Sequence, residues 1–392
     1  MNKKEAKETA AYRVRLFRAA ANFQKPERIP HLSAAVTWKI FDAGESLPKA
    51  LTDFSVMEKC QRHFLDSYKV DALMDIGIRN QFTITEAFGS PGYYYYNSES
   101  VGIHDHAFCT VDTLEEYLAE PEKYIWERVM PEKFGPDWDK KELAVWKKAF
   151  RAYMDYTRFI IHMSSVQKEY GIPSMAPNNP MKGAIQFGIE ELEANILGIK
   201  QLSVAMRRNP DKIEDFCRRW DEEHIEPLVE KIKTLKGPDY KYCFDASMMM
   251  LAQNILNPKQ FERYYWPSLS KLLHAYEDKG CNVRVFTEGE IGRYAEYFKD
   301  FKKGTLSFHL EGDDPFEFRE KLPNVAIIGG MTTDMLSKAT PEVCVEYAKK
   351  LCDELGREGG FIFSENKMLS FRNDATGENM AAVCEFLNGY EL

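Results

Sequence analysis

Five acidic or imidazole side chains stand where short apolar runs give way to polar loops, and their types suit metal binding or proton transfer. They are Asp75, Asp245, Glu288, His309 and Glu365. Carboxylates brought together repel one another and shift their pKa values unless a cation compensates. If the fold gathers these side chains, the sequence therefore indicates a bound metal, a cationic ligand or acid–base chemistry.

A zinc ion is the simplest occupant, because zinc accepts imidazole nitrogen together with carboxylate oxygen and a catalytic zinc keeps three protein ligands. We expect Glu288, His309 and Glu365 to be both the catalytic residues and the metal ligands, since Glu288 and His309 lie 21 residues apart, about one strand–helix step. Asp75 and Asp245 would orient the substrate, and Met248 would form an apolar pocket wall. The alternative is structural, with each acid paired to a Lys or Arg and His309 only hydrogen-bonded.

The elements that must position these residues alternate along the second half of the chain. Apolar runs and amphipathic segments follow one another from about residue 240, as in a parallel sheet covered by helices. Asn257 and Pro258 begin one predicted helix that stops near Gly280, and Thr340 with Pro341 begins another. The predicted strands are 31–38, 70–77, 241–248, 282–289, 305–312, 324–330 and 360–366, with a further helix over 55–68.

This order predicts an α/β protein, specifically a TIM (β/α)8 barrel with an N-terminal helical extension. In such a barrel, catalytic residues converge at the C-terminal ends of the strands. We expect one domain over residues 1–392. Residues 90–180, which include Tyr93–Tyr96 and part of the loop 174–183, would be inserted on the barrel. A separate domain for this region is the weaker alternative.

The composition narrows the classes of partner. The chain has a formal net charge of -9 and a sequence pI near 5.6, which disfavours nucleic acid and anionic membranes. Its N-terminus has no apolar stretch of the kind found in secretory signals, and no run approaches the length of a membrane span. The eight cysteines are scattered and read as reduced thiols. We therefore expect a cytoplasmic protein that acts on a small molecule or another protein.

Other conspicuous residues rank lower as sites. His104, Asp105 and His106 could bind a metal, but such a segment is more often a solvated surface. The tyrosine run 93–96 could wall an aromatic site or form a strand near the surface. The sequence holds no dinucleotide fingerprint after a strand, no phosphate-binding loop and no serine-nucleophile elbow. Nucleotide-dependent enzymes and serine hydrolases are therefore disfavoured.

Several segments together resemble the uroporphyrinogen-decarboxylase-like superfamily. They are ERIP at 27–30, FDAS at 244–247, LNPKQFERYYWPSLSKLL at 256–273, VFTEG at 285–289, GGMT at 329–332 and GFIFSEN at 360–366. The resemblance runs over most of the chain and implies a single barrel. The decarboxylase branch uses no metal and holds propionates with an arginine-rich N-terminal stretch. Residues 31–44 here contain no arginine, which argues against porphyrinogen decarboxylation.

The other branch comprises corrinoid-dependent methyltransferases, whose zinc site resembles His-x-Cys at one strand tip and Cys at a later tip. This chain has Phe286, Glu288 and Glu365 at those positions. It is more similar to the methyltransferase I components of anaerobic O-demethylases, whose ligand pattern is Glu, fourteen residues, Glu, twenty residues, His. Glu288 and His309 match the second half, Leu273 stands at the first glutamate, and Glu365 is the substitute ligand that we expect.

The resemblance implies transfer of a methyl group from a methoxylated, aromatic substrate to the cobalt of a corrinoid (cobalamin) carried by a partner protein. Zinc would act as the Lewis acid. A homodimer is compatible with the sequence. Two alternatives stay open: a decarboxylase-like enzyme with a non-porphyrin substrate, in which Asp75 or Asp245 handles protons without metal, and a non-catalytic binder of a ligand or of a corrinoid protein.

Overall fold

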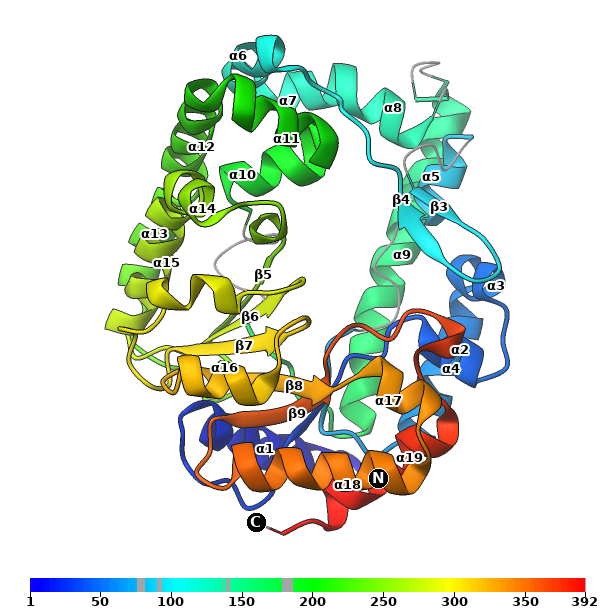
Figure 1. The fold of residues 1–392 in the computed structure, drawn as a ribbon. Helices are drawn as coiled ribbons and strands as arrows, with labels where there is room; N and C mark the ends of the chain where they lie inside the picture. The colour runs from blue at the N-terminus through cyan, green and yellow to red at the C-terminus, as the bar shows by residue number, and fades with distance from the viewer. Residues whose placement is uncertain (76–81, 90–93, 136, 139–141, 178–185, 392) are drawn as a thin grey trace.

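A curled sheet of seven parallel strands forms the centre of the protein in a computed structural model, which describes residues 1–75, 82–89, 94–135, 137–138, 142–177 and 186–391 (Figure 1). The strand order is β2-β1-β9-β8-β7-β6-β5, and a separate antiparallel hairpin pairs β3 with β4. The strands are β1 (His31–Ser33), β2 (Ala72–Leu73), β3 (Tyr94–Tyr96), β4 (Val101–Ile103), β5 (Ala246–Met250), β6 (Val283–Thr287), β7 (Leu306–Leu310), β8 (Ala326–Met331) and β9 (Phe361–Glu365).

An irregular segment lies beside the start of β5. It is found where the two edge strands of the curled sheet, β2 and β5, come round toward each other. The carbonyl oxygens of Ser174 and Met175 accept hydrogen bonds from the amides of Cys243 and Phe244, at 3.3 and 2.8 Å. Met175 also packs, with Met74 from the end of β2, against the apolar cluster inside the sheet. The segment thus takes the place of an eighth strand. The predicted α/β barrel fold is confirmed, with seven regular strands among the described residues.

Strand register assigns every sheet residue to an inner or an outer face. Met249, Phe286, His309, Ile328 and Ile362 follow one another across five neighbouring strands. Ile328 and Ile362 belong to the cluster inside the barrel, with Phe17 and Phe244. Side chains alternate along a strand, so the residues before and after each of these face outward, toward the helices. Both faces of the sheet are buried, as the nearly continuous apolar strands predict.

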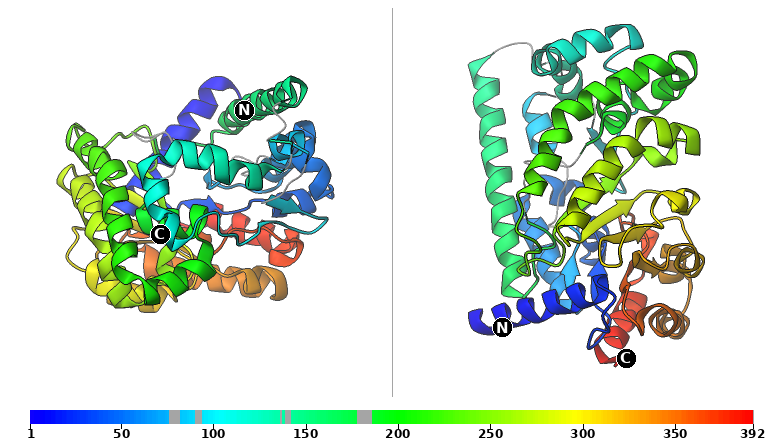
Figure 2. Two further views of the ribbon diagram at one scale, coloured as in Figure 1. Left: turned by 90° about the horizontal axis from the view of Figure 1, so that it is seen from above. Right: turned by 90° about the vertical axis from the view of Figure 1, so that its left-hand side faces the viewer.

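Helices cover the outer face, and helix α1 lies under the barrel (Figures 1 and 2). The helices before β5 are α1 (Lys3–Ala21), α2 (Trp38–Asp42), α3 (Leu47–Thr52), α4 (Phe54–Ser67), α5 (Phe82–Ala87), α6 (Leu114–Ala119), α7 (Pro121–Tyr124), α8 (Met130–Phe134), α9 (Leu143–Glu169), α10 (Gly188–Glu191), α11 (Gly198–Arg208), α12 (Pro210–His224) and α13 (Glu226–Lys233). Those after it are α14 (Pro258–Tyr264), α15 (Trp266–Asp278), α16 (Pro315–Lys321), α17 (Thr333–Lys338), α18 (Pro341–Leu351) and α19 (Gly377–Gly389).

Short 3-10 and π turns extend several of these helices. They are η1 (Val111–Thr113), η2 (Ile125–Val129), η3 (Leu192–Ile196), η4 (Ala252–Asn254), η5 (Gly292–Tyr297), η6 (Cys352–Gly356) and η7 (Arg372–Asp374). Helices α6 to α9 and the β3–β4 hairpin lie outside the seven-stranded sheet. None of the helices in the described ranges has the length and apolar character that crossing a bilayer requires.

The local predictions fare unevenly. The last four predicted strands agree with β6 to β9 within two residues at each end, and all eight cysteines are buried free thiols. Thr340 begins α18, but its side chain makes no capping hydrogen bond. Residues 76–77 of the second predicted strand, Tyr93, and residues 178–183 of the predicted loop lie outside the described residues.

The predicted strand 241–248 is displaced, and this changes the place of Asp245. The strand begins only at Ala246, so Asp245 precedes β5 and lies at the bottom of the barrel. Its carboxylate accepts two hydrogen bonds from the Arg18 guanidinium of α1, at 2.6 and 3.0 Å, and others from the amides of Asp239 and Asn282. The expectation that Asp245 lies at a C-terminal strand tip and binds substrate is therefore wrong, and the residue instead fastens α1 under the barrel.

Replacement of Asp245 by alanine is expected to lower the free energy of unfolding by about 3–5 kcal/mol, because it leaves the buried Arg18 charge without its partner. Chemical denaturation of the purified variant measures this change. Asp215→Ala, which breaks an exposed pair with Arg218, is the control and should cost about 1 kcal/mol or less. Equal losses in the two variants would contradict the structural role of Asp245.

Candidate functional site

His309 is fully buried on the inner face of β7, and both of its ring nitrogens are engaged. Nδ1 accepts a hydrogen bond from Arg284 at 3.1 Å, and the Nε2 hydrogen is donated to the backbone carbonyl of Glu365 at 2.8 Å. Burial, assisted by the positive charge of Arg284, lowers the pKa of His309 to about 3. The imidazole is therefore neutral and held in place by neighbouring strands.

Glu365 ends β9 on the opposite face of the sheet. Its register partner is Met331, so its side chain points outward, away from His309. The carboxylate accepts a hydrogen bond from the Ala34 amide at 2.6 Å and one from the Ser33 hydroxyl at 3.3 Å. His31 lies 3.6 Å from it, and Cys384 of α19 approaches the other side of that imidazole at 3.9 Å. Glu365 thus joins β1 and β9.

The predicted zinc ligands do not fit one ion. His309 faces inward, the Glu365 carboxylate faces outward, and only the Glu365 carbonyl meets the histidine. Throughout the described ranges, which include all three predicted ligands, no group of three His, Cys, Asp or Glu side chains is arranged to hold a metal. The alternation of side chains along the strands separates His309 from the Glu365 carboxylate. The prediction that these two side chains bind one zinc ion is therefore wrong.

Arg284 supplies a polar layer inside the barrel that the sequence analysis missed. Its guanidinium, only 5% exposed, donates to the Ser247 hydroxyl of β5 and to Nδ1 of His309, both at 3.1 Å. Hydrogen bonds therefore run from Ser247 through Arg284 and His309 to the Glu365 carbonyl, across four of the strands. The signal was present in the sequence, as an arginine between Val283 and Val285 in a strand that is apolar apart from its last residue, Thr287.

The charge of Glu288, at the C-terminal end of β6, acts on Glu193 in the turn η3. Glu288 follows β6, and its backbone is held by Met250 and by the Gln253 side chain. Burial, together with the charges of Glu288 and Asp105, raises the pKa of Glu193 in η3 to about 7. The Oε2 atom of Glu193 is buried and has no hydrogen-bond partner within the described part of the chain. Glu193 can therefore hold or release a proton near neutral pH.

Glu190 places η3 over the strand ends. Its carboxyl group accepts hydrogen bonds from the Leu251 amide just after β5, at 3.1 Å, and from the Tyr265 hydroxyl, at 2.5 Å. Burial raises the pKa of Glu190 to about 8, so the group carries a proton at neutral pH. One turn later, the π-helical turn η3 presents Glu193, and such turns are frequent at functional sites. A sequence pattern does not distinguish this turn from an ordinary helix.

The other predicted residues lie in different places. Asp75 follows β2 at the same end of the barrel, where the Gln167 side chain of α9 donates to its carbonyl. Met248 is buried on the outer face of β5, in register with Val285, and packs in the core under the helices. It therefore belongs to the core, which contradicts its predicted place in a pocket wall.

The His104–His106 segment is exposed, in agreement with the prediction of a solvated surface. His106 pairs with Glu132, and the Asp105 carboxylate accepts the Ile199 amide of α11 at 3.0 Å. Asp105 is thereby held at the first turn of α11, where it adds negative charge near Glu193. The segment thus contributes to the site through Asp105.

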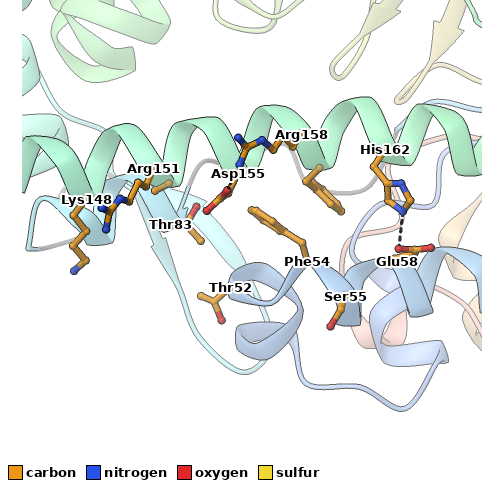
Figure 3. A pocket seen from close by; sticks show the side chains of 12 residues that line it. Thr52, Phe54, Ser55, Glu58, Thr83, Lys148, Arg151, Asp155, Arg158 and His162 are labelled. Carbon is orange, nitrogen blue, oxygen red and sulfur yellow. Dashed lines mark hydrogen bonds and ion pairs between the residues drawn. The ribbon is translucent and has the colours of Figure 1, made fainter.

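A groove of about 680 Å³ lies away from the strand ends, between α9 and the helices α3 to α5 (Figure 3). Phe54 and Phe159 stack in it at 4.5 Å between ring centroids, and His162 pairs with Glu58 at 2.8 Å. Lys148, Arg151 and Arg158 of α9 are among the residues that line it. It shares no residue with the region around Glu193 and Glu288. We place the candidate active site in that region because burial raises the pKa values of Glu190 and Glu193 there.

Comparisons with known proteins agree with this architecture. Residues 191–389, slightly more than half of the chain, match the uroporphyrinogen decarboxylase (URO-D) family, and the protein belongs to that family. A solved structure described as a methyltransferase from Methanosarcina mazei aligns with a TM-score of 0.55 and 13% identity, covering 94% of this chain and 96% of that one. At this identity the likeness shows a shared fold. No curated protein matches the sequence.

The buried, neutral His309 predicts a pH dependence of stability. Its folded-state pKa near 3 lies below the usual 6.5, so between these values the unfolded chain binds a proton that the folded chain does not. Acidification should therefore reduce stability by up to about 1.4 kcal/mol per pH unit from this residue. Urea unfolding at pH 7, 6 and 5 should show a shallower loss for His309→Gln, whereas exposed His274→Gln should follow the unaltered protein.

Zinc binding tests whether the side chains of His309 and Glu365 bind a common ion. Titration of zinc into chelator-treated protein should give the same affinity for the unaltered protein, His309→Gln and Glu365→Gln, because the two side chains do not reach a common ion. Calorimetry measures the affinity, and circular dichroism confirms that each variant is folded. A tenfold or larger loss of zinc affinity in both folded variants would restore the original ligand set.

Proposed function

We propose that the protein is a methyltransferase that takes a methyl group from a methoxylated, aromatic substrate and passes it to a corrinoid carried by a partner protein. The observation that carries the proposal is Glu193 near the strand ends, where its buried Oε2 atom has no hydrogen-bond partner among the described residues and where burial and the charge of Glu288 raise its pKa. Membership of the URO-D family and the fold shared with a structure described as a methyltransferase support it. With eight free thiols and a net charge of -9, we propose that it acts in the cytoplasm.

The difficulty of this chemistry is the leaving group. When the bond between the methyl carbon and the ether oxygen breaks, its electron pair stays on oxygen and forms an aryloxide. Glu193 can donate its proton to that oxygen as the bond breaks, which releases a neutral phenol and leaves a carboxylate. The methyl carbon forms its new bond to the nucleophile that the corrinoid supplies when bound. The negative charges of Glu288 and Asp105 keep the proton on Glu193 until it is needed.

The polar layer inside the barrel would fix the other side of the substrate. Arg284 and Ser247 present hydrogen-bond donors on the inner face, where His309 holds the guanidinium. Asp75 faces the same end of the barrel from β2 and would orient the substrate. No step is assigned to zinc, because the described residues expected to bind it do not converge.

A second candidate is a decarboxylase-like enzyme that acts on a non-porphyrin carboxylic acid without metal. The URO-D family match and the position of Asp75 at a C-terminal strand end favour it. Arg284 would then attract the carboxylate, and Glu193 or Asp75 would protonate the carbon that carbon dioxide leaves. Both candidates use the same mouth, so they are separated by the product formed.

Glu193→Gln is expected to lower kcat for methyl transfer about 100-fold or more, because the amide cannot donate the proton. Transfer from a panel of methoxyarenes to reduced corrinoid protein measures the rate. In the unaltered enzyme, the rate should fall as the pH rises above about 7, since Glu193 then loses its proton. This fall should be absent in the residual activity of the variant.

Glu191→Gln is the matched control two residues before Glu193, where the carboxylate is bonded by Tyr117 and Asn195. It should retain most of the activity. Release of carbon dioxide from aromatic acids, with no methyl transfer, would favour the decarboxylase. Full methyl transfer by folded Glu193→Gln would contradict the role of Glu193.

A further inference from the structure

The groove between α9 and the helices α3 to α5 contains an aromatic surface. Phe54 and Phe159 stack with their ring centroids 4.5 Å apart and their planes inclined by 15°. Phe159 is buried and Phe54 is half-buried, and both rings line the groove (Figure 3). Aromatic side chains pack favourably against the ring of another aromatic group. The groove therefore offers a flat apolar contact to a ligand.

The acidic side chains that line the groove are already paired. The Asp155 carboxylate accepts a hydrogen bond from Arg158 at 3.1 Å. Glu58 pairs with Arg62 at 2.9 Å and with His162 at 2.8 Å. Each of these carboxylates thus has a cationic partner of its own. The charge of any further basic residue in the groove is therefore not cancelled by them.

Two further basic side chains supply a surplus of positive charge. Lys148 and Arg151 lie three residues apart on α9, so they are neighbours on one face of the helix. Neither side chain forms an ion pair or a hydrogen bond in the described part of the chain. Thr83 of α5 lines the groove near Arg151, and its buried Oγ1 atom lacks a hydrogen-bond partner among the described residues (Figure 3). These groups can donate hydrogen bonds to an anion.

The composition of the groove limits the shape of the ligand. Only Phe54, Ala152 and Phe159 among its lining residues are apolar, and the others carry hydroxyl or charged groups. A long acyl chain would lie against those polar groups, whereas a single flat ring would cover the aromatic pair alone. The volume of about 680 Å³ is in the range of small-molecule sites. The ligand that fits has a compact aromatic part close to its charge.

We infer that this groove binds a small aromatic carboxylate, with its ring against Phe54 and its carboxylate between Lys148 and Arg151. A planar carboxylate matches the two parallel N–H groups of an arginine. The nearby charges of Asp155 and Glu58 disfavour a ligand with several negative charges. The groove shares no lining residue with the region around Glu193, so this is a second ligand site, separate from the candidate active site.

Calorimetric titration of cinnamate into the full chain tests the binding. The Kd should lie below about 1 mM and should increase with salt, because exposed charges contribute to it. Uncharged cinnamamide should bind about tenfold more weakly, and Arg151→Gln should weaken cinnamate binding by about the same factor. Lys147→Gln is the matched control, since it removes an exposed charge from the same helix outside the groove. It should leave the Kd unchanged.

Further variants and probes test where the ligand lies and which part of it is recognised. Phe54→Leu should weaken binding of cinnamate and cinnamamide alike, because it removes the aromatic face. Octanoate and inorganic phosphate, which lack a ring, should bind more weakly than cinnamate. Glu193→Gln should bind cinnamate as the unaltered protein does, so this result is independent of the proposed methyl transfer. Circular dichroism confirms that each variant is folded.

Several outcomes would overturn the inference. They are a Kd above about 1 mM, unchanged cinnamate affinity in folded Arg151→Gln or Phe54→Leu, and loss of binding in Glu193→Gln, which would place the ligand at the strand ends. Equal affinity for octanoate would indicate a site for acyl chains. Equal affinity for phosphate would indicate a site for anions of any shape.

Discussion

The alternation of side chains along parallel strands decides which polar groups of this protein can meet. His309 faces the barrel interior and the Glu365 carboxylate faces the helices, although the backbone of Glu365 bonds His309. The interior therefore holds Ser247, Arg284 and His309 as one hydrogen-bonded layer. The outer face holds His31, Ser33 and Glu365 as another polar group. Polar residues on the two faces of the sheet thus serve different parts of the molecule.

The architecture was largely readable from the sequence, because strands buried on both faces are nearly continuous apolar runs. The same property concealed the face of the sheet on which each side chain lies. The alternation of polar and apolar residues disappears when both faces are covered. The run Tyr242–Phe244 looked like part of a strand, but the ladder begins at Ala246, which moved Asp245 to the other end of the barrel. Glu193 gave no signal, because its importance depends on burial and on the distant residues Asp105 and Glu288.

The acid–base chemistry at the C-terminal end of the barrel depends on residues that lie outside the sheet. Glu190 is bonded to the end of β5 and to Tyr265, and this contact sets the π turn that carries Glu193. Asp105 comes from the segment after the hairpin, held by the first turn of α11. The barrel supplies Glu288 and the polar layer below it. The acid–base properties of this site therefore depend on segments outside the strands as well as on the barrel.

The segment that stands in for an eighth strand has a mechanical consequence. At this seam, the amides of Cys243 and Phe244 bond Ser174 and Met175, in place of the ladders that join β5 through β9. Among the described residues, two backbone hydrogen bonds join this boundary, and a boundary with few such bonds parts more easily than a full ladder. The circumference of the barrel can then adjust at one joint while the strands bearing Arg284 and His309 keep their register. The joint adjoins β5, so Ser247 is the member of the polar layer that lies nearest the movable boundary.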